Sequence, residues 1–177
     1  MKVLFITNAT NKYGASRSLG LLIEGLLKEK YLQDQDIFLV YQRYFRKKKS
    51  QLELKIYKGL NNKNRWILPA SIIYVGHPAG FFIRFVRFVH GLFFSFFYFA
   101  RYRKQLLSMN VDVIHINSIT LWFLLLYLPK NIPIIMHVRE KLELQSNRFE
   151  AEWARKAIIR RSNAIIAVSE EVSEDFI

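Results

Sequence analysis

The sequence contains no cysteine, and only 7 glycine and 4 proline residues among 177. The absence of cysteine excludes disulfide bonds and thiolate zinc sites, and it favours a cytosolic protein. The small number of glycine and proline residues, with 51% hydrophobic residues, excludes a largely disordered chain. The N-terminal apolar run Val3–Ile6 is too short for a signal peptide, so we interpret it as a first strand. We expect one packed domain.

Acidic residues are also few, with 14 Asp and Glu against 27 Lys and Arg, for a net charge of +13. This excess attracts polyanions such as nucleic acid, anionic lipid or nucleotide-linked substrates. The basic cluster Arg43–Lys49, which includes Tyr44 and Phe45, is compatible with a nucleic-acid contact, a solvated loop or a contact with anionic lipid. Among these partners we place nucleic acid last.

Strand and helix patterns alternate along the chain, which predicts an α/β protein with a Rossmann-like, doubly wound parallel sheet. A polar loop is expected at Asn61–Arg65, and Trp66–Gly80 has no clear pattern. The expected strands are Lys2–Thr7, Asp36–Tyr41, Leu52–Ile56 near an edge, Asp112–Ser118, Pro133–Glu140 and a buried Ala164–Val168, and the expected helices are Ala15–Glu29, Phe81–Met109, Leu121–Leu128 and Phe149–Arg161.

Ligands of open parallel sheets bind beyond the carboxyl ends of the strands. There the pattern places Asn117 and Ser118 after one strand and His137 at the end of another. The imidazole of His137 is suited to accept a proton from a hydroxyl or to hydrogen-bond a sugar, although a structural histidine is an equal alternative. Arg139 and Glu140 are candidates for binding a phosphate and a pair of hydroxyls, or belong to a solvated loop.

The start of the first predicted helix also bears on the site. Gly14, Ala15 and Ser16 lead into the first helix, whose free N–H groups suit an anionic or polyhydroxylated ligand. The lone glycine lacks the G-x-G-x-x-G fingerprint, so dinucleotide binding has weak support.

His115 lies inside its strand, where we expect a hydrogen-bonded core histidine. No spacing of His, Asp or Glu suggests a metal site.

The segment Phe81–Met109 combines many phenylalanines with arginines and a histidine. Charges within the segment argue against a membrane-spanning helix, and the pattern favours an interfacial helix on anionic lipid. The alternative is a helix buried against the sheet or another chain. The residues expected to contact the membrane are Arg84, Arg87, Phe93, Phe94, Phe97, Arg101, Arg103 and Lys104.

Five pieces in order resemble the N-terminal half of family 4 glycosyltransferases: Lys2–Ile6 with Asn8, Tyr13–Ser16 with Leu19, Asp112–Ser118, Ile132–Glu140 and Ala164–Ser169. The resemblance implies a single N-terminal domain of GT-B type over residues 1–177, with an insertion-like basic and aromatic segment at about 66–109. It also implies that the donor-binding C-terminal domain is absent. Tyr13 stands where the family commonly has a second glycine, and Ser16 where it commonly has an acid.

For function, the resemblance implies the acceptor-side half of a retaining enzyme in polysaccharide or glycolipid synthesis. His137 would line the catalytic centre, and Gly14–Ser16 would approach the donor. The nucleotide-sugar is a co-substrate and no metal or other cofactor is expected. The partners would be a donor-binding domain or separate chain, a sugar or lipid-linked acceptor, and the inner face of the cytoplasmic membrane. The competing expectation is a non-catalytic Rossmann-like module that docks on a membrane or a partner protein.

Overall fold

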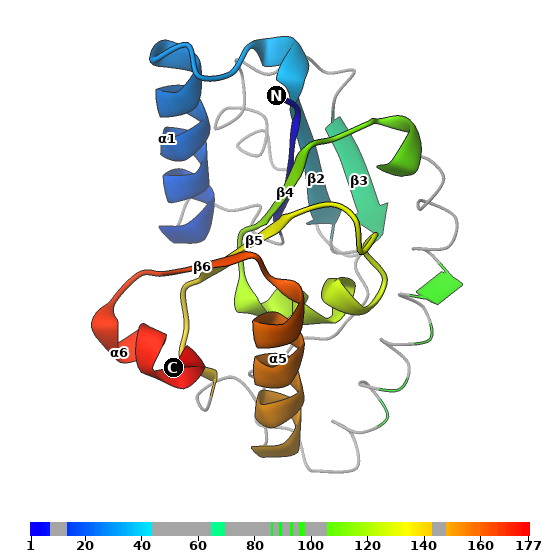
Figure 1. Cartoon of the computed structure of the whole chain (residues 1–177), viewed down its shortest axis with the longest axis vertical. Helices are drawn as coiled ribbons and strands as arrows, with labels where there is room; N and C mark the ends of the chain where they lie inside the picture. Colours follow the sequence, from blue (N-terminus) through cyan, green and yellow to red (C-terminus); the bar gives the residue numbers. More distant parts are fainter. Residues whose placement is uncertain are drawn as a thin grey trace.

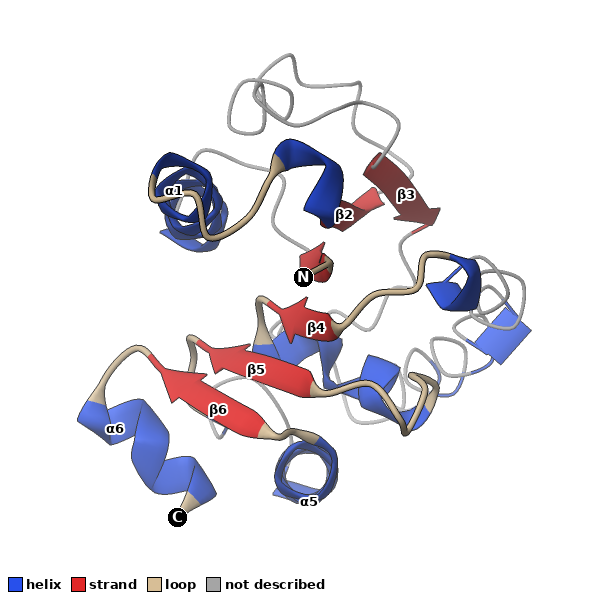
Figure 2. Ribbon diagram, turned by 45° about the horizontal axis from the view of Figure 1, so that its top comes forward, coloured by secondary structure: helices blue, strands red, loops and turns tan. Residues whose placement is uncertain are grey.

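The computed structural model describes residues 1–7, 14–43, 65–69, 86, 89, 93, 96, 97, 106–142 and 148–177. Its six strands form one parallel sheet in the order β3-β2-β1-β4-β5-β6, seen as a row in Figure 2. This is the strand order of the doubly wound Rossmann fold, so the expected fold class is confirmed. The strands are β1 (Val3–Thr7), β2 (Ile37–Arg43), β3 (Arg65–Pro69), β4 (Val113–Ile116), β5 (Ile134–Val138) and β6 (Ala164–Ala167).

Helices cover both faces of the sheet (Figure 1). The helices whose bounds are defined are α1 (Gly14–Lys28), α5 (Arg148–Arg161), α6 (Glu170–Ser173) and the 3-10 helices η1 (Asp34–Asp36), η3 (Ile119–Leu126) and η4 (Glu174–Phe176). Successive side chains of a strand point to opposite faces, so β1 contributes Val3 and Phe5 to one core and Leu4 and Ile6 to the other. The first core packs beneath α1, and the second packs beneath η3 and α5.

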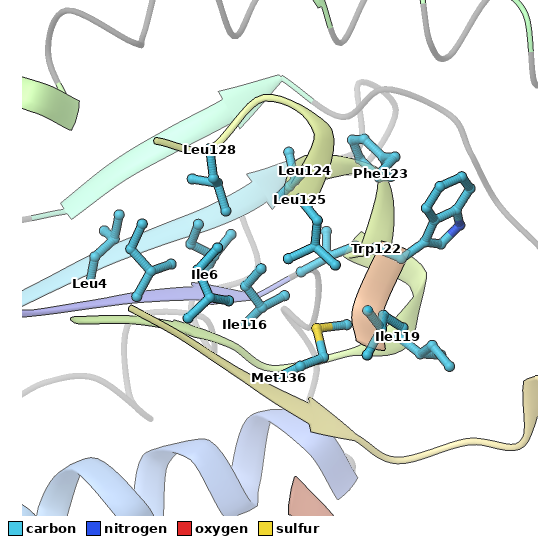
Figure 3. Packing of buried hydrophobic residues seen from close by; sticks show 14 of the residues in the cluster. Leu4, Ile6, Ile116, Ile119, Trp122, Phe123, Leu124, Leu125, Leu128 and Met136 are labelled. Atoms are coloured by element: carbon cyan, nitrogen blue, oxygen red, sulfur yellow. The ribbon is translucent and has the colours of Figure 1, made fainter. Parts of the chain in front are cut away.

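The larger core is built around η3 (Figure 3). Strand side chains such as Ile6, Ile116 and Met136 pack in one cluster with Trp122 and Leu125 of η3. Because almost every residue of η3 is apolar, the helix is buried nearly all round, as expected for an element enclosed by a sheet and α5.

The predicted elements along β1, α1, β2, β4, β5 and α5 are present, with shifts of a few residues at their ends. The expected apolar helix Leu121–Leu128 is a 3-10 helix that begins earlier, at Ile119, because Ser118 caps it. The short helices α6 and η4 follow the last strand and were not predicted.

Two predictions about strands need correction. The last strand is not buried: Ile166 of β6 is 45% exposed, because β6 forms the edge of the sheet and the face it shares with α1 is uncovered there. Residues 65–69 form the other edge strand, although they were expected to be loop or unpatterned. The strand expected at residues 52–56 lies outside the described residues.

Candidate functional site

Polar side chains gather at the carboxyl ends of β1, β4 and β5. Thr7 is the last residue of β1, and Asn117 directly follows β4, which pairs with β1. The strand order reverses between β1 and β4, because β2 lies on one side of β1 and β4 on the other. In doubly wound sheets this switch point is where ligands bind. The fold therefore places Thr7 and Asn117 at the candidate site, the position where doubly wound sheets bind their ligands.

Asn117 connects the end of β4 to three other elements at this position. Its amide nitrogen donates to the Ala15 carbonyl at 3.1 Å and to the Thr7 hydroxyl at 3.4 Å. Its amide oxygen accepts from Nε of Arg139 at 3.2 Å and from a terminal guanidinium nitrogen at 2.9 Å. The side chain is completely buried, so these bonds satisfy its donors and acceptor away from water. The start of α1 is thereby tied to the ends of β1, β4 and β5.

His137 lies in the same group of side chains. Its Nδ1 is 3.3 Å from the terminal guanidinium nitrogen of Arg139 that also contacts Asn117. Burial, followed by the positive charge of Arg139, lowers the pKa of His137 from 6.5 to about 4. At neutral pH the imidazole is therefore uncharged. A neutral ring at a strand end is suited to hydrogen-bonding a polar ligand.

His115 of β4 lies deeper, beside His137. The centroids of the two rings are 5.6 Å apart with an edge-on orientation, and the Phe5 ring lies 5.3 Å away on the other side. Burial, with smaller contributions from His137 and Arg139, lowers the pKa of His115 to about 4. The residue is buried as expected, but within the described part of the chain neither ring nitrogen has a hydrogen-bond partner. His115 thus leaves polar atoms next to the site unused.

Glu140 follows Arg139 in a loop that the C-terminal helices support. Burial raises the pKa of the Glu140 carboxyl, partly offset by Arg139, and one carboxyl oxygen is buried with no hydrogen-bond partner among the described residues. Asp175 accepts a hydrogen bond from the Leu142 backbone at 2.8 Å, and Lys141 pairs with Glu171 at 2.6 Å. The helices α6 and η4, which were not predicted, therefore contact the segment that follows Arg139 and Glu140 through one hydrogen bond and one ion pair.

The other predicted substrate-binding residues fall into different settings. Gly14 begins α1 with a positive φ of 34°, a conformation that favours glycine. Ser118 is buried, and its hydroxyl caps η3 by accepting from the Thr120 backbone at 3.2 Å, so it has a structural use. The side chain of Ser16 and the loop 8–13 lie outside the described residues. The binding roles of all of these residues stay predictions.

The predicted membrane-contact residues are only partly described. Phe93 and Phe97 are helical and exposed, and their rings lie 4.8 Å apart. The other members lie outside the described residues: Arg84, Arg87, Phe94, Arg101, Arg103 and Lys104. No helix in the described part of the chain is long and apolar enough to cross a membrane. Among the same residues, no group of three His, Asp or Glu side chains could hold a metal ion.

Thr7 is a site residue that the sequence did not reveal, and at Ala15, which was predicted, the contacting group is the backbone carbonyl. Both contact Asn117 from positions more than 100 residues away in the chain. A threonine at the end of a buried apolar strand was the available signal, since Thr7 is a completely buried polar side chain after Val3–Ile6.

The strand order defines a Rossmann-like α/β domain with a hydrogen-bonded group of polar side chains at its switch point. The model of glycosyltransferase family 4 matches residues 63–177, and the chain belongs to this family. No curated protein sequence matches the chain significantly.

Two solved GT-B glycosyltransferases share the fold. HepE of Anabaena, determined with UDP and glucose, has a TM-score of 0.60 at 14% identity, over 99% of this chain and 40% of that protein. UGT89C1 of Arabidopsis thaliana, determined with UDP, has a TM-score of 0.56 at 14% identity, over 98% of this chain and 47% of that protein. This chain therefore spans less than half the length of either structure.

Proposed function

We propose that the chain forms the acceptor-side wall of the active site in a retaining, nucleotide-sugar-dependent glycosyltransferase. The observation that carries the proposal is the hydrogen-bonded group of Thr7, Asn117, Arg139 and His137 at the switch point of the sheet. Membership of glycosyltransferase family 4 supports sugar transfer as the class of reaction. Both structural neighbours were determined with UDP, which makes a UDP-sugar the first donor to test.

The residues have distinct roles in this proposal. His137 contacts the reacting sugar, and Arg139 holds the imidazole in place. The first turn of α1, beginning at Gly14, offers backbone N–H groups to the phosphates or hydroxyls of the ligand. Glu140 binds a hydroxyl of the substrate. The acceptor is a sugar or a lipid-linked sugar used in polysaccharide or glycolipid synthesis, and no metal takes part.

A second domain, in the same protein or in a partner chain, would bind the nucleotide-sugar. This part of the proposal is supported by the lengths of the two structural neighbours, of which this chain spans only 40% and 47%. The chain by itself is then expected to bind UDP-glucose weakly and to transfer no glucose.

The test joins this chain to the donor-binding domain of a family 4 enzyme and measures transfer from UDP-glucose. Turnover is expected only in the joined protein, with His137→Ala abolishing it and Lys130→Ala, at an exposed position, leaving it unchanged. NMR of the product should show the anomeric configuration of the donor. Full turnover in the His137→Ala variant would remove the site assignment, and an inverted product would contradict the retaining mechanism.

A second candidate function is docking on an anionic membrane. It is favoured by an apolar stripe formed by the exposed helical residues Val86, Val89, Phe93, Phe96 and Phe97, each between 48% and 59% exposed. Their spacing by three and four residues places them on one side of a helix. The five basic residues at 84, 87, 101, 103 and 104 lie close by in the sequence. An apolar stripe with basic neighbours matches an interfacial helix on anionic lipid.

The membrane proposal predicts that the double variant Phe93→Ser, Phe97→Ser binds anionic vesicles at least about tenfold more weakly. The reason is that two aromatic rings that would insert into the lipid are lost. Co-sedimentation with phosphatidylcholine–phosphatidylglycerol vesicles measures this. Leu21→Ser is the matched control, since Leu21 is 58% exposed on α1. Equal binding by the double variant and the control would exclude the stripe as the contact.

A further inference from the structure

Arg139 occupies one ring nitrogen of His137. A terminal guanidinium nitrogen lies 3.3 Å from Nδ1 of the imidazole. Arginine carries five N–H donors and no acceptor, so Nδ1 must be the acceptor in this contact. A neutral imidazole with an accepting Nδ1 bears its proton on Nε2. We propose that Arg139 is a positioning residue that fixes His137 as the Nε2–H tautomer, so that the ring presents a hydrogen-bond donor to the ligand.

The guanidinium is held in the orientation that this contact needs. Two of its nitrogens donate to the amide oxygen of Asn117, at 2.9 and 3.2 Å. Asn117 cannot turn its amide over, because its nitrogen donates to the Ala15 carbonyl, which accepts and does not donate. The chain of contacts from Ala15 through Asn117 to Arg139 therefore sets which nitrogen of His137 carries the proton.

Charge supports the same assignment. A cation beside Nδ1 opposes a second proton on the ring, and burial opposes it further, so the pKa of His137 is lowered to about 4. His115, the other histidine beside the ring, is itself neutral because its pKa is also about 4. The ring thus stays neutral at neutral pH.

The chemical consequence, which rests on the proposed function, concerns what His137 does to a sugar. With Nδ1 occupied and Nε2 protonated, the ring has no nitrogen available to take a proton from an attacking hydroxyl. It is instead placed to donate from Nε2 to a sugar hydroxyl or a phosphate oxygen. The sequence left two roles open for His137, proton acceptor and hydrogen-bond partner. The fixed tautomer favours the hydrogen-bond partner.

Nitrogen NMR of the imidazole rings tests the tautomer directly and needs no substrate. In the uniformly ¹⁵N-labelled chain at pH 7, long-range ¹H–¹⁵N spectra should show His137 with a protonated Nε2 and an unprotonated Nδ1. His137→Gln identifies the signals. A spectrum with the proton on Nδ1, or with both tautomers equally populated, would overturn the proposal.

Arg139→Met removes the donor and the charge but keeps an unbranched side chain. The variant should lose the single tautomer, and the pKa of His137 should rise from about 4 toward 6.5 without reaching it, because burial remains. Arg160→Met, at an exposed arginine, is the control that should change neither. An unchanged tautomer in folded Arg139→Met would also overturn the proposal. The wild-type spectrum decides the matter even where the variant does not fold.

The outcomes separate this inference from the proposed function. A fixed Nε2–H tautomer in a protein that never transfers sugar leaves the positioning role of Arg139 standing and removes the enzyme proposal. If the joined enzyme is active but His137 populates both tautomers, the enzyme proposal stands and the positioning role of Arg139 is removed.

Discussion

Asn117 contacts α1, β1 and Arg139 through buried hydrogen bonds, so its loss should disturb the site. Asn117→Ala leaves the Ala15 carbonyl and the Arg139 guanidinium without this buried partner. Unmade buried hydrogen bonds cost about 1–3 kcal/mol, so we expect the free energy of unfolding in urea to fall by that amount. Asn131→Ala is the control, because Asn131 is exposed and surface changes stay within about 0.5 kcal/mol. Equal effects of the two substitutions would show that the network adds no stability.

The two neighbouring histidines should make stability depend on pH. Both have folded-state pKa values of about 4, below the ordinary value of 6.5, so between these pH values the unfolded chain binds protons that the folded chain does not. Their contribution to stability is complete above pH 6.5 and is lost as the pH falls toward 4. Urea denaturation should therefore give a smaller free energy of unfolding at pH 5 than at pH 7.

His115→Phe tests the share of the deeper histidine. The ring nitrogens of His115 make no hydrogen bond within the described residues, and Phe5 already packs beside the ring, so an apolar ring suits the position. The variant should lose less stability than the wild type between pH 7 and pH 5. An unchanged difference between the two pH values would contradict the lowered pKa of His115.

At the scale of elements, the start of η3 depends on one hydroxyl. Ser118 accepts from the Thr120 backbone and pairs with its hydroxyl at 2.9 Å, and both contacts are lost in Ser118→Ala. Loss of such a cap costs about 0.5–2 kcal/mol, measured by thermal or urea unfolding. Ser162→Ala is a matched control, because the Ser162 hydroxyl is buried without a partner among the described residues and its removal should be close to neutral. A neutral Ser118→Ala would show that η3 needs no cap.

The elements also show what could be predicted from sequence. α1 was predictable because Leu19 and Ile23 recur at helical spacing and are buried together. The exposure of β6 was not predictable, because an apolar strand has the same sequence pattern at the edge and in the centre of a sheet. Only the strand order shows that β6 lies at the edge. β3 was missed because residues 65–69 are short and end in a proline, which indicates an edge strand only once β2 is known to pair with it.

For the site, the sequence predicted residues but not contacts. Asn117 and His137 were predicted because polar side chains at strand ends converge in parallel sheets. Their bonds to Ala15 and Arg139 depend on rotamers and on the placement of α1 over the sheet, which spacing does not contain. The tautomer of His137 follows only from those contacts.

At the scale of the whole molecule, the net charge of +13 should govern encounters with surfaces. Charges that meet an anionic bilayer are screened by salt, since the Debye length falls from about 10 Å at 0.1 M to about 3 Å at 1 M. Binding to phosphatidylcholine–phosphatidylglycerol vesicles should therefore weaken steeply as NaCl is raised, and pure phosphatidylcholine vesicles should bind little at any salt concentration. Any binding that survives at 1 M NaCl should disappear in the Phe93→Ser, Phe97→Ser variant, because apolar contact is not screened. A DNA duplex that displaces the protein from vesicles of equal charge would instead favour nucleic acid as the partner of the positively charged chain.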